Sequence, residues 1–381
     1  MSAGDFFAAE EQARAGRLGC ACPEDAPRAL RRGLGAGRLA AGFALIVLAQ
    51  ALTLGVLPLA GAMLAPRPAL DALPLAAFLA GAAAASLPAS FLLDAFGRRA
   101  GFALGASLGV AGGLIAAYAM MSAAFPMLVL GAAWLGAAQG FGLFYRHAAA
   151  FGAGAGGQGA AMARLLGAGA LAGLIGPVLA GEAEALAVPY TFAGTLMLAA
   201  LAQLGALAFA VSLPEARFSH AELTVEAMGA AVAPRPLAWG ALIGPTLVGA
   251  LAWAAMTSAM AGAPLAFAGC GIGVPLISGF VAWHVVAMYA PALAGGLLAK
   301  RLGAGPLALA ALVLCLGAAL AVRLAPDVAG IAAAFLLVGA GWSLATLGAT
   351  LRLHERGAPS RLQLAVHDGT LLLAALAGVF L

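Results

Sequence analysis

Two short pairs of side chains inside otherwise apolar segments offer ligands for a metal ion. They are Met256-x-x-x-Met260 and His284-x-x-x-Met288, and a four-residue spacing places both members of a pair on one face of a helix. Thioether sulfur is a soft ligand and imidazole a borderline one, so the set favours Cu⁺ over Mg²⁺, Ca²⁺ or Mn²⁺. Zinc is less favoured because no thiolate or carboxylate joins the pairs. Methionine also fills gaps in apolar helices, so packing is the alternative interpretation.

Three cysteines are accessory candidates for metal or thiol chemistry. Cys270 lies between the two pairs, near the expected outer surface, where it either captures metal, pairs with another thiol or is simply a small apolar residue. Cys20-Ala21-Cys22 lies in the N-terminal tail, where two thiolates suit a soft cation and a hand-off to a cytoplasmic copper chaperone. An incidental pair in a disordered tail is the alternative. Cys315 is expected to pack in an apolar segment.

The composition predicts an all-α polytopic membrane protein. Of 381 residues, 64% are hydrophobic and only 9% are charged, whereas a soluble domain carries about 25% charged residues. Backbone groups in lipid must be paired internally, and the continuous apolar runs exclude the alternating pattern of an outer-membrane barrel. The net charge of +4 is attributed to loop arginines that set orientation in the lipid, so no nucleic-acid partner is expected.

The pattern of apolar runs predicts eleven membrane-spanning helices in two bundles. A cytoplasmic tail (1–37) precedes an N-terminal six-helix bundle (38–212), a cytoplasmic linker (213–236) and a C-terminal bundle (237–381), and no signal peptide precedes the first span. Spans are expected at about 38–63, 72–93, 100–121, 125–147, 161–181, 187–212, 237–263, 273–299, 304–323, 329–351 and 361–381. A cytoplasmic N-terminus leaves only Arg67 and Arg323 of the 19 Lys and Arg residues outside, as the positive-inside rule requires.

Two short basic loops look like copies of each other and predict an internal repeat. The first contains Asp94, Gly97, Arg98 and Arg99, and the second contains Lys300, Arg301 and Gly303. Aligning Gly97 with Gly303 maps the first span onto the seventh and the fifth onto the eleventh. A sixth helix of the second copy would lie beyond the end of this sequence, so the prediction is six plus five helices with the twelfth absent.

The first loop is similar to the signature loop of the major facilitator superfamily, Gly-x-x-x-Asp-Arg-x-Gly-Arg-Arg/Lys. Asp94, Gly97, Arg98 and Arg99 match it, whereas Ser90 and Ala95 depart from it. The resemblance covers nearly the whole chain and implies a transporter with two bundles and alternating access. In that family the loop gates the cytoplasmic ends of the helices, so Asp94 is expected to pair with a helix end or an arginine, and the basic pair Lys300-Arg301 marks the second copy of the gating loop.

A narrower resemblance concerns the Met and His pairs. With Cys270 between them, and with Phe144-Tyr145-Arg146 elsewhere, they resemble a subfamily that includes bacterial copper importers and riboflavin importers. The resemblance implies an inner-membrane copper importer that supplies haem–copper cytochrome c oxidase assembly. Cu⁺ is then the substrate, passed along a ladder of Met256, Met260, His284 and Met288, and no cofactor is bound permanently.

Two alternatives to copper import stay open. In the first, the cargo is a small organic solute such as riboflavin. Such a cargo calls for an aromatic cavity, although few Trp and Tyr residues fall mid-span on the expected cavity helices. In the second, the chain is a metal-holding assembly or sensing protein that does not transport its ligand. No enzyme is expected, because no nucleophile–base set, phosphate-cradling loop or closed metal site is present.

Polar residues inside the predicted spans are further candidates, because a charge in lipid is costly and usually faces a cavity. His367-Asp368 in the last span is a candidate for proton coupling or for a structural pair with a neighbouring helix. Arg146-His147, at the end of the fourth span, is expected to reach the membrane interface. Ligands or interhelical hydrogen bonds are expected from Gln50, Thr53, Gln139 and Ser343.

Overall fold

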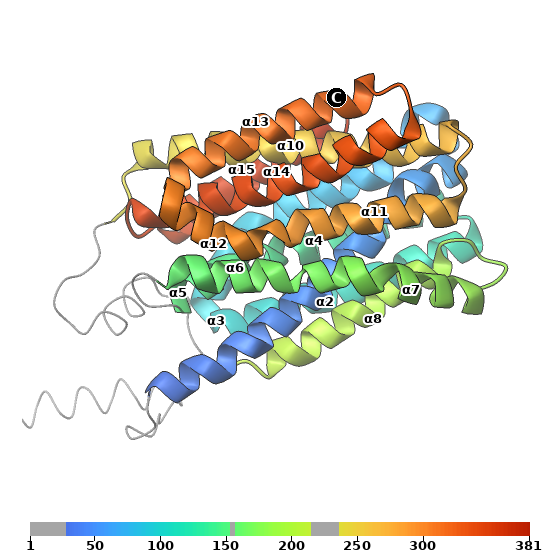
Figure 1. The fold of residues 1–381 in the computed structure, drawn as a ribbon. Helices are drawn as coiled ribbons and strands as arrows, with labels where there is room; N and C mark the ends of the chain where they lie inside the picture. The colour runs from blue at the N-terminus through green and yellow to red at the C-terminus, as the bar shows by residue number, and fades with distance from the viewer. Residues whose placement is uncertain (1–27, 153–156, 215–235) are drawn as a thin grey trace, which may run out of the picture. The chain divides into compact units, whose positions relative to one another are not determined.

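The computed structural model describes residues 28–152, 157–214 and 236–381. These ranges are almost entirely helical. Residues 36–381 form one compact unit (Figure 1). The first half of the chain contributes α2 (Arg28–Leu64), η1 (Pro68–Leu70), α3 (Leu73–Ser122), α4 (Phe125–Gly142), α5 (Phe144–Gly152), α6 (Gln158–Ala168), α7 (Ala170–Leu186) and α8 (Ala193–Val211). The second half contributes α10 (Trp239–Gly269), α11 (Val274–Tyr289), α12 (Pro291–Leu302), α13 (Ala304–Leu324), α14 (Val328–Glu355) and α15 (Arg361–Gly378).

Helix α3 contains two antiparallel spans that reverse direction at Gly97. This glycine has φ 84°, which a residue with a Cβ rarely adopts. Glycine packing gives the directions: Gly136 of α4 lies against Phe78 and Gly140 against Ala82, whereas Gly112 lies against Leu135. Together with Gly105 against Phe141, these pairs make the first part of α3 parallel to α4 and the second part antiparallel to it.

The described residues confirm the predicted membrane-spanning fold. Nine helices within them are long and apolar enough to cross a membrane, and one of these, at 68–122, contains the two spans that meet at Gly97. Helix α15 adds an 18-residue helix that carries His367 and Asp368. The eleven predicted spans are therefore all helical. The predicted linker lies largely outside the described residues, as does most of the predicted tail, although α2 already begins at Arg28.

The two loops of the predicted repeat have the same unusual backbone. Gly303, which the repeat aligns with Gly97, has φ 86° and ψ 147°, close to the φ 84° and ψ 164° of Gly97. Both glycines therefore end one helix and begin the next in the same conformation. This likeness supports the alignment of the two halves.

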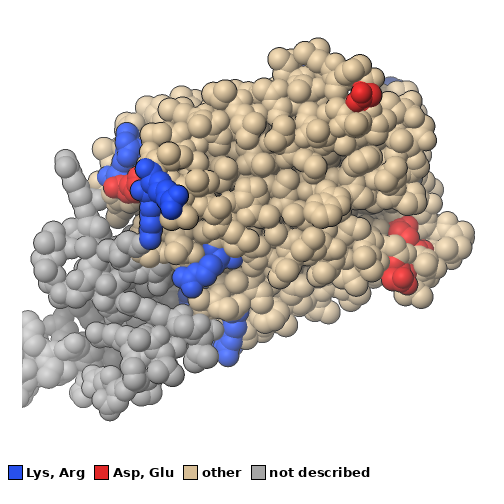
Figure 2. All heavy atoms as spheres, viewed as in Figure 1, with Lys and Arg blue, Asp and Glu red and all other residues tan. Residues whose placement is uncertain are grey.

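Charges gather at the two ends of the unit and leave the face between them apolar (Figure 2). We call the end at which α12 finishes, with Lys300 and Arg301 in its last turn, the basic end. The opposite end carries most of the visible acidic residues. Exposed side chains between the ends are mainly large and apolar, such as Leu247 and Val313, as expected of a surface that faces lipid.

Breaks in several helices position the interior side chains. Helix α11 gives way to α12 at Pro291, which lacks a backbone N–H, and Tyr289 stands just before that break. Helix α5 starts at Phe144, directly after α4 ends, and carries Tyr145, Arg146 and His147 into the interior. The two halves pack against each other through α3 with α15, α7 with α11 and α6 with α12.

Candidate transport site

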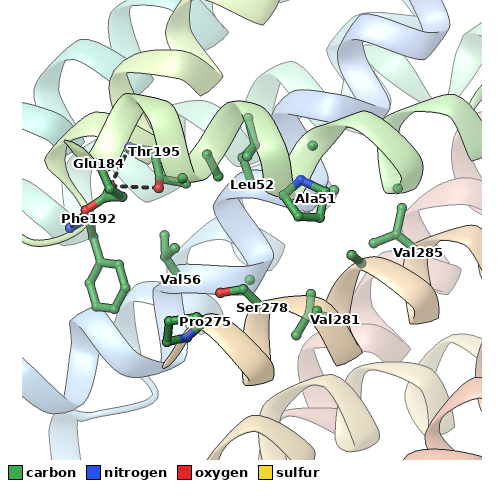
Figure 3. A pocket seen from close by; sticks show the side chains of 18 of the residues that line it. Ala51, Leu52, Val56, Glu184, Phe192, Thr195, Pro275, Ser278, Val281 and Val285 are labelled. Atoms are coloured by element: carbon green, nitrogen blue, oxygen red, sulfur yellow. Dashed lines mark hydrogen bonds between the residues drawn. The ribbon is translucent and has the colours of Figure 1, made fainter. Parts of the chain in front are cut away.

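A cavity of about 480 Å³ lies between α2, α7, α8 and α11 (Figure 3). Small residues such as Gly55 and Gly176 leave the space, and Leu52, Val56 and Val281 give it an apolar wall. Because residues at the end of α7 and the start of α11 also line it, the cavity extends towards the end opposite the basic end. Its volume lies within the range of about 300–1,000 Å³ that is typical of small-molecule sites.

The carboxylate of Glu184 holds the rim of this cavity together. Glu184 Oε2 accepts a hydrogen bond from the Phe192 backbone N–H at 2.7 Å. Its Oε1 accepts from the Thr195 backbone N–H at 2.6 Å and from the Thr195 hydroxyl at 2.7 Å (Figure 3). These bonds satisfy N–H groups at the start of α8, which have no partner within the helix. Glu184 therefore fixes the turn between α7 and α8.

Aromatic rings from six helices form a continuous chain through the interior. Two of the five Trp and two of the four Tyr residues belong to it. Neighbouring centroids are 3.9 Å apart for Phe102–Tyr145, 6.2 Å for Tyr145–Phe43, 6.1 Å for Phe43–Tyr289, 5.9 Å for Tyr289–Trp342 and 5.2 Å for Trp342–Trp253. The chain crosses from the first half to the second between Phe43 and Tyr289. The cavity itself has no Trp or Tyr among its lining residues, in line with the expectation of few such residues on the cavity helices, and the aromatic chain forms elsewhere because residues far apart in sequence converge.

Polar groups accompany the aromatic chain where it crosses between the halves. Gln50 Oε1 accepts hydrogen bonds from Gln139 Nε2 at 3.0 Å and from the Tyr289 hydroxyl at 3.1 Å, which confirms the interhelical bond predicted for the two glutamines. Ala51, the next residue after Gln50, already lines the cavity, as does Val285, one turn from Tyr289. We call Gln50, Gln139, Tyr289 and the aromatic chain the central layer. Gln50 and Tyr289 are helix neighbours of residues that line the cavity, although no side chain of the layer lines the cavity itself.

Several buried donors in the central layer have no hydrogen-bond partner within the described residues. They are the Tyr145 hydroxyl and the indole N–H groups of Trp253 and Trp342. An unpaired buried donor costs about 1–3 kcal/mol. None of the three side chains is among those that line the cavity.

A buried network of charged and titratable groups lies beyond the central layer, towards the basic end. Arg146 of α5 forms an ion pair with Asp368 of α15. His147 Nε2 lies 3.1 Å from the other oxygen of Asp368, and His147 Nδ1 lies 3.2 Å from His354 Nε2 of α14. All four side chains are buried. We call them the inter-half network, since α5 belongs to the first half and α14 and α15 to the second.

The inter-half network corrects the expectation that Arg146 and His147 reach the membrane interface. Arg146 is 3% exposed and His147 is fully buried. A buried charge needs a partner, and Asp368 supplies one from the other half of the chain. Asp368 thus forms the structural pair with a neighbouring helix that was one of its two predicted roles.

His367 faces a different neighbour from Asp368. Its Nδ1 lies 2.9 Å from the Thr246 hydroxyl of α10, within the second half. Adjacent positions on a helix point in different directions, which is why the two residues of the His367-Asp368 pair separate. A role of this pair in proton coupling stays a prediction.

The predicted gating loop makes an ion pair between the two halves at the basic end. Asp94 pairs with Arg361 at the start of α15, so the expectation that Asp94 finds an arginine or a helix end is confirmed. The Ser90 hydroxyl donates to the Arg361 carbonyl at 2.8 Å. Arg98 Nε donates to the Pro214 carbonyl at 3.3 Å. Lys300-Arg301 forms the exposed last turn of α12.

The four predicted copper ligands are buried on two helices. Met256 and Met260 lie on α10, and His284 and Met288 lie on α11. Both helices pack against α14, where the His284 ring stacks on Phe335 with centroids 3.8 Å apart. The arrangement of the four ligands around one ion stays a prediction.

His284 keeps one ring nitrogen available in this environment. Its Nδ1 donates to the Phe335 carbonyl at 2.6 Å, a bond that assigns the hydrogen to Nδ1. Within the described residues its buried Nε2 has no hydrogen-bond partner. In the same residues no group of three or more His, Cys, Asp or Glu side chains is arranged to hold a metal ion, so any site would depend on the methionines.

The remaining predicted residues are distributed over the chain. Cys270 is an exposed thiol that caps the end of α10, and Cys315 is buried as expected. Cys20 and Cys22 lie outside the described residues. The Thr53 hydroxyl donates within its own helix, to the Ala49 carbonyl, and the buried Ser343 hydroxyl has no hydrogen-bond partner in the described part of the chain. Neither makes the expected interhelical bond there.

Comparison with known structures identifies the class of fold. No family model matches the sequence. The proton:xylose symporter XylE, of the major facilitator superfamily, has a TM-score of 0.68 at 14% identity, with 93% of this chain and 88% of XylE covered. The human organic anion transporter MFSD10 has a TM-score of 0.65 at 17% identity, with 93% and 92% covered. At these identities the likeness concerns the fold.

Comparison with curated sequences adds a nearer relative. The riboflavin transporter RfnT of Brucella anthropi is 31% identical over 307 residues, which are 79% of this chain and 76% of RfnT. The chain belongs to the same family as RfnT and has the fold of the major facilitator superfamily. RfnT, XylE and MFSD10 are all transporters.

Sequence reasoning missed several members of the site, among them Tyr289, Trp342, His354 and Glu184. A signal was available for His354, because ionisable side chains such as His354 and Arg146 are rare near the ends of apolar spans. For Trp342 and Tyr289 no local signal exists, since apolar aromatic residues are ordinary members of such spans.

Proposed function

We propose that the chain carries a flavin-like organic solute such as riboflavin across the bacterial inner membrane. The observation that carries the proposal is the central layer next to the 480 Å³ cavity. A flat aromatic ring system with polar edges can stack on indole and phenol rings. Its acceptor atoms can bind the unpaired indole N–H groups of Trp253 and Trp342.

The nature of the cavity favours an organic solute over a bare ion. Its wall is mainly apolar, and apolar walls with a few placed polar groups are typical of sites for organic molecules. A copper ion needs only two to four donor atoms and no comparable space. The riboflavin transported by RfnT, the 31% identical relative, is a cargo of this kind.

The contacts between the halves suggest the state and direction of access. The Asp94–Arg361 pair and the inter-half network close the basic end, whereas the cavity extends towards the opposite end. With the basic end in the cytoplasm, as the positive-inside rule predicts, this is the state that receives solute from outside. Import follows when the inter-half contacts open and the cavity closes.

Copper import for haem–copper cytochrome c oxidase assembly is the second candidate. The observation that favours it is the buried, unpartnered Nε2 of His284, with Met288 one turn further along α11. In this alternative Cu⁺ passes Met260, Met256, His284 and Met288 in turn, and a cytoplasmic chaperone receives it. A neutral imidazole with thioethers would bind such an ion weakly enough to release it.

Uptake by cells that cannot synthesise riboflavin tests the first candidate. The native chain should restore accumulation of labelled riboflavin. Gln50→Leu removes the acceptor of the hydrogen bonds from Gln139 and Tyr289, each worth about 0.5–1.5 kcal/mol. Accumulation of labelled riboflavin should therefore fall about tenfold. Trp283→Ala, at a side chain 60% exposed on α11, is the matched control and should transport normally.

The same cells distinguish the two cargoes. Labelled copper should accumulate equally with and without the chain if the cargo is a flavin. Copper accumulation that requires the native chain and disappears in Met256→Ala, at equal membrane level, would replace the first candidate by the second. A chain that binds either compound in a one-to-one ratio but never concentrates it would instead be a holding protein.

A further inference from the structure

The cavity between α2, α7, α8 and α11 has one charged side chain among the described residues that line it. This is Glu184 on α7, and every other lining residue is apolar, a glycine, a serine or a threonine. No lysine or arginine belongs to this lining. The cavity therefore offers a solute one negative charge and no positive charge.

Hydrogen bonds hold the Glu184 carboxylate at the rim of the cavity. Its Oε2 accepts from the Phe192 backbone N–H, and its Oε1 accepts from the backbone N–H and the hydroxyl of Thr195. The backbone donors lie at the start of α8, the helix end that favours a negative charge. A side chain with three such bonds (Figure 3) does not swing away from the opening when a solute enters.

The surroundings of the rim add no cation to the lining of the cavity. Glu182, an exposed residue, places a second carboxylate near the end of α7. Arg67, which precedes η1, and Arg323, in the last turn of α13, are not among the lining residues, and Arg323 donates a hydrogen bond to Ser258. The charge that meets a solute at the rim is consequently negative.

We propose that the cavity selects an uncharged solute and that Glu184 excludes the phosphate esters of that solute. The inference rests on the proposed function, because it specifies which form of a flavin-like solute the site takes. Riboflavin itself has no phosphate, whereas a phosphate monoester carries a charge of about −1.5 to −2 near neutral pH. Glu184 is thus a residue that determines specificity.

Both orientations of a phosphate ester in the cavity are unfavourable. A phosphate directed inward faces the apolar wall of Leu52, Ala172 and Val285, and a buried ion without a partner is costly. A phosphate directed outward lies at the rim beside Glu184. At an effective dielectric constant of about 20, one unit charge about 8 Å from a like charge weakens binding by about 30-fold. Nearly two charges on the phosphate therefore weaken it by about 100-fold or more.

Equilibrium binding to the purified full chain in lipid nanodiscs tests the proposal, with quenching of flavin fluorescence as the signal. Three flavins are compared: riboflavin, riboflavin 5′-phosphate and riboflavin 5′-acetate. The two esters add groups of similar size at the same position, and only the phosphate is charged. The 5′-phosphate should bind about 100-fold or more weakly than riboflavin, whereas the 5′-acetate should bind much as riboflavin does.

Two variants assign the selectivity to charge at the rim. Glu184→Gln removes the negative charge and keeps one oxygen that can accept from Thr195, so the affinity ratio of riboflavin to its 5′-phosphate should narrow by about tenfold or more. Ser278→Lys places a cation in the cavity from α11 (Figure 3) without altering the cap of α8, and it should narrow the same ratio. It replaces Glu184→Gln if that protein does not fold. Ser278→Gln adds a side chain without charge and should keep the native ratio.

The possible results separate this inference from the proposed function. The inference is overturned if the native chain binds riboflavin and its 5′-phosphate equally, or if it rejects the 5′-acetate as strongly as the 5′-phosphate. It is also overturned if the affinity ratio in both Glu184→Gln and Ser278→Lys equals that of the native chain. These results would leave the proposed function intact, whereas a native chain that binds no riboflavin would refute both.

Discussion

Neutralising Asp368 should open the basic end of the transporter. Asp368→Asn leaves Arg146 buried at 3% exposure without its counter-charge, and breaking a buried ion pair costs about 3–5 kcal/mol. This cost applies only to the closed arrangement, because Arg146 reaches water when the halves separate at that end. At about 1.4 kcal/mol per factor of ten, even the lower value shifts the population towards the open arrangement by about 100-fold.

The reactivity of a buried cysteine measures this shift. Ala150 is fully buried one turn after Arg146 on α5, so Ala150→Cys in a cysteine-free background should react with a maleimide only when the basic end opens. Asp368→Asn should accelerate the labelling by about 100-fold or until opening is no longer limiting. Asp327→Asn is the matched control, since Asp327 caps the start of α14 at the opposite end.

The double variant Arg146→Gln with Asp368→Asn completes this test. It removes both charges, so no uncompensated charge remains in the closed arrangement and labelling should return most of the way to the native rate. If Asp368→Asn labels within about threefold of the native chain, the ion pair does not hold the basic end closed. The reasoning is also refuted if Asp327→Asn produces the same acceleration.

Three further predictions concern other parts of the structure. Asp94→Asn should accelerate the same labelling by no more than about fivefold, because Arg361 is half exposed and such pairs are worth about 0–1 kcal/mol. Gly136→Ala should lower the melting temperature by several degrees, since its Cβ would lie 1.8 Å from a backbone oxygen of α3, whereas Gly181→Ala, with open space around it, should not. Glu184→Ala should cost about 1–2 kcal/mol in unfolding experiments, because it removes the cap of α8.

Much of the fold could be predicted from the sequence because lipid imposes simple constraints. Long apolar runs must be helical in a membrane, so the spans follow from composition and length. The reversal at Gly97 was also predictable, since a short basic loop with a glycine separates two apolar runs. What local patterns did not reveal is which helices touch, because that depends on close packing at glycines such as Gly136 and Gly112.

The site was only partly predictable for the same reason. Gln50 and Gln139 were identified because polar groups in apolar spans are rare, and their hydrogen bond confirms the prediction. The partner of Arg146 is 222 residues away in Asp368, and no spacing rule connects them. The aromatic chain likewise forms from residues on separate helices, so no local pattern in the sequence predicts it.

Counterflow in liposomes tests directly whether the chain transports riboflavin. Purified protein is reconstituted, the liposomes are loaded with unlabelled riboflavin, and entry of labelled riboflavin is measured beside Gln50→Leu and Trp283→Ala. A carrier that alternates between two sides exchanges solute faster than it moves it one way. Accelerated, transient accumulation is expected with the native chain and with Trp283→Ala, and little accumulation with Gln50→Leu. Labelled riboflavin that enters no faster than in protein-free liposomes, whatever the loading, would contradict it.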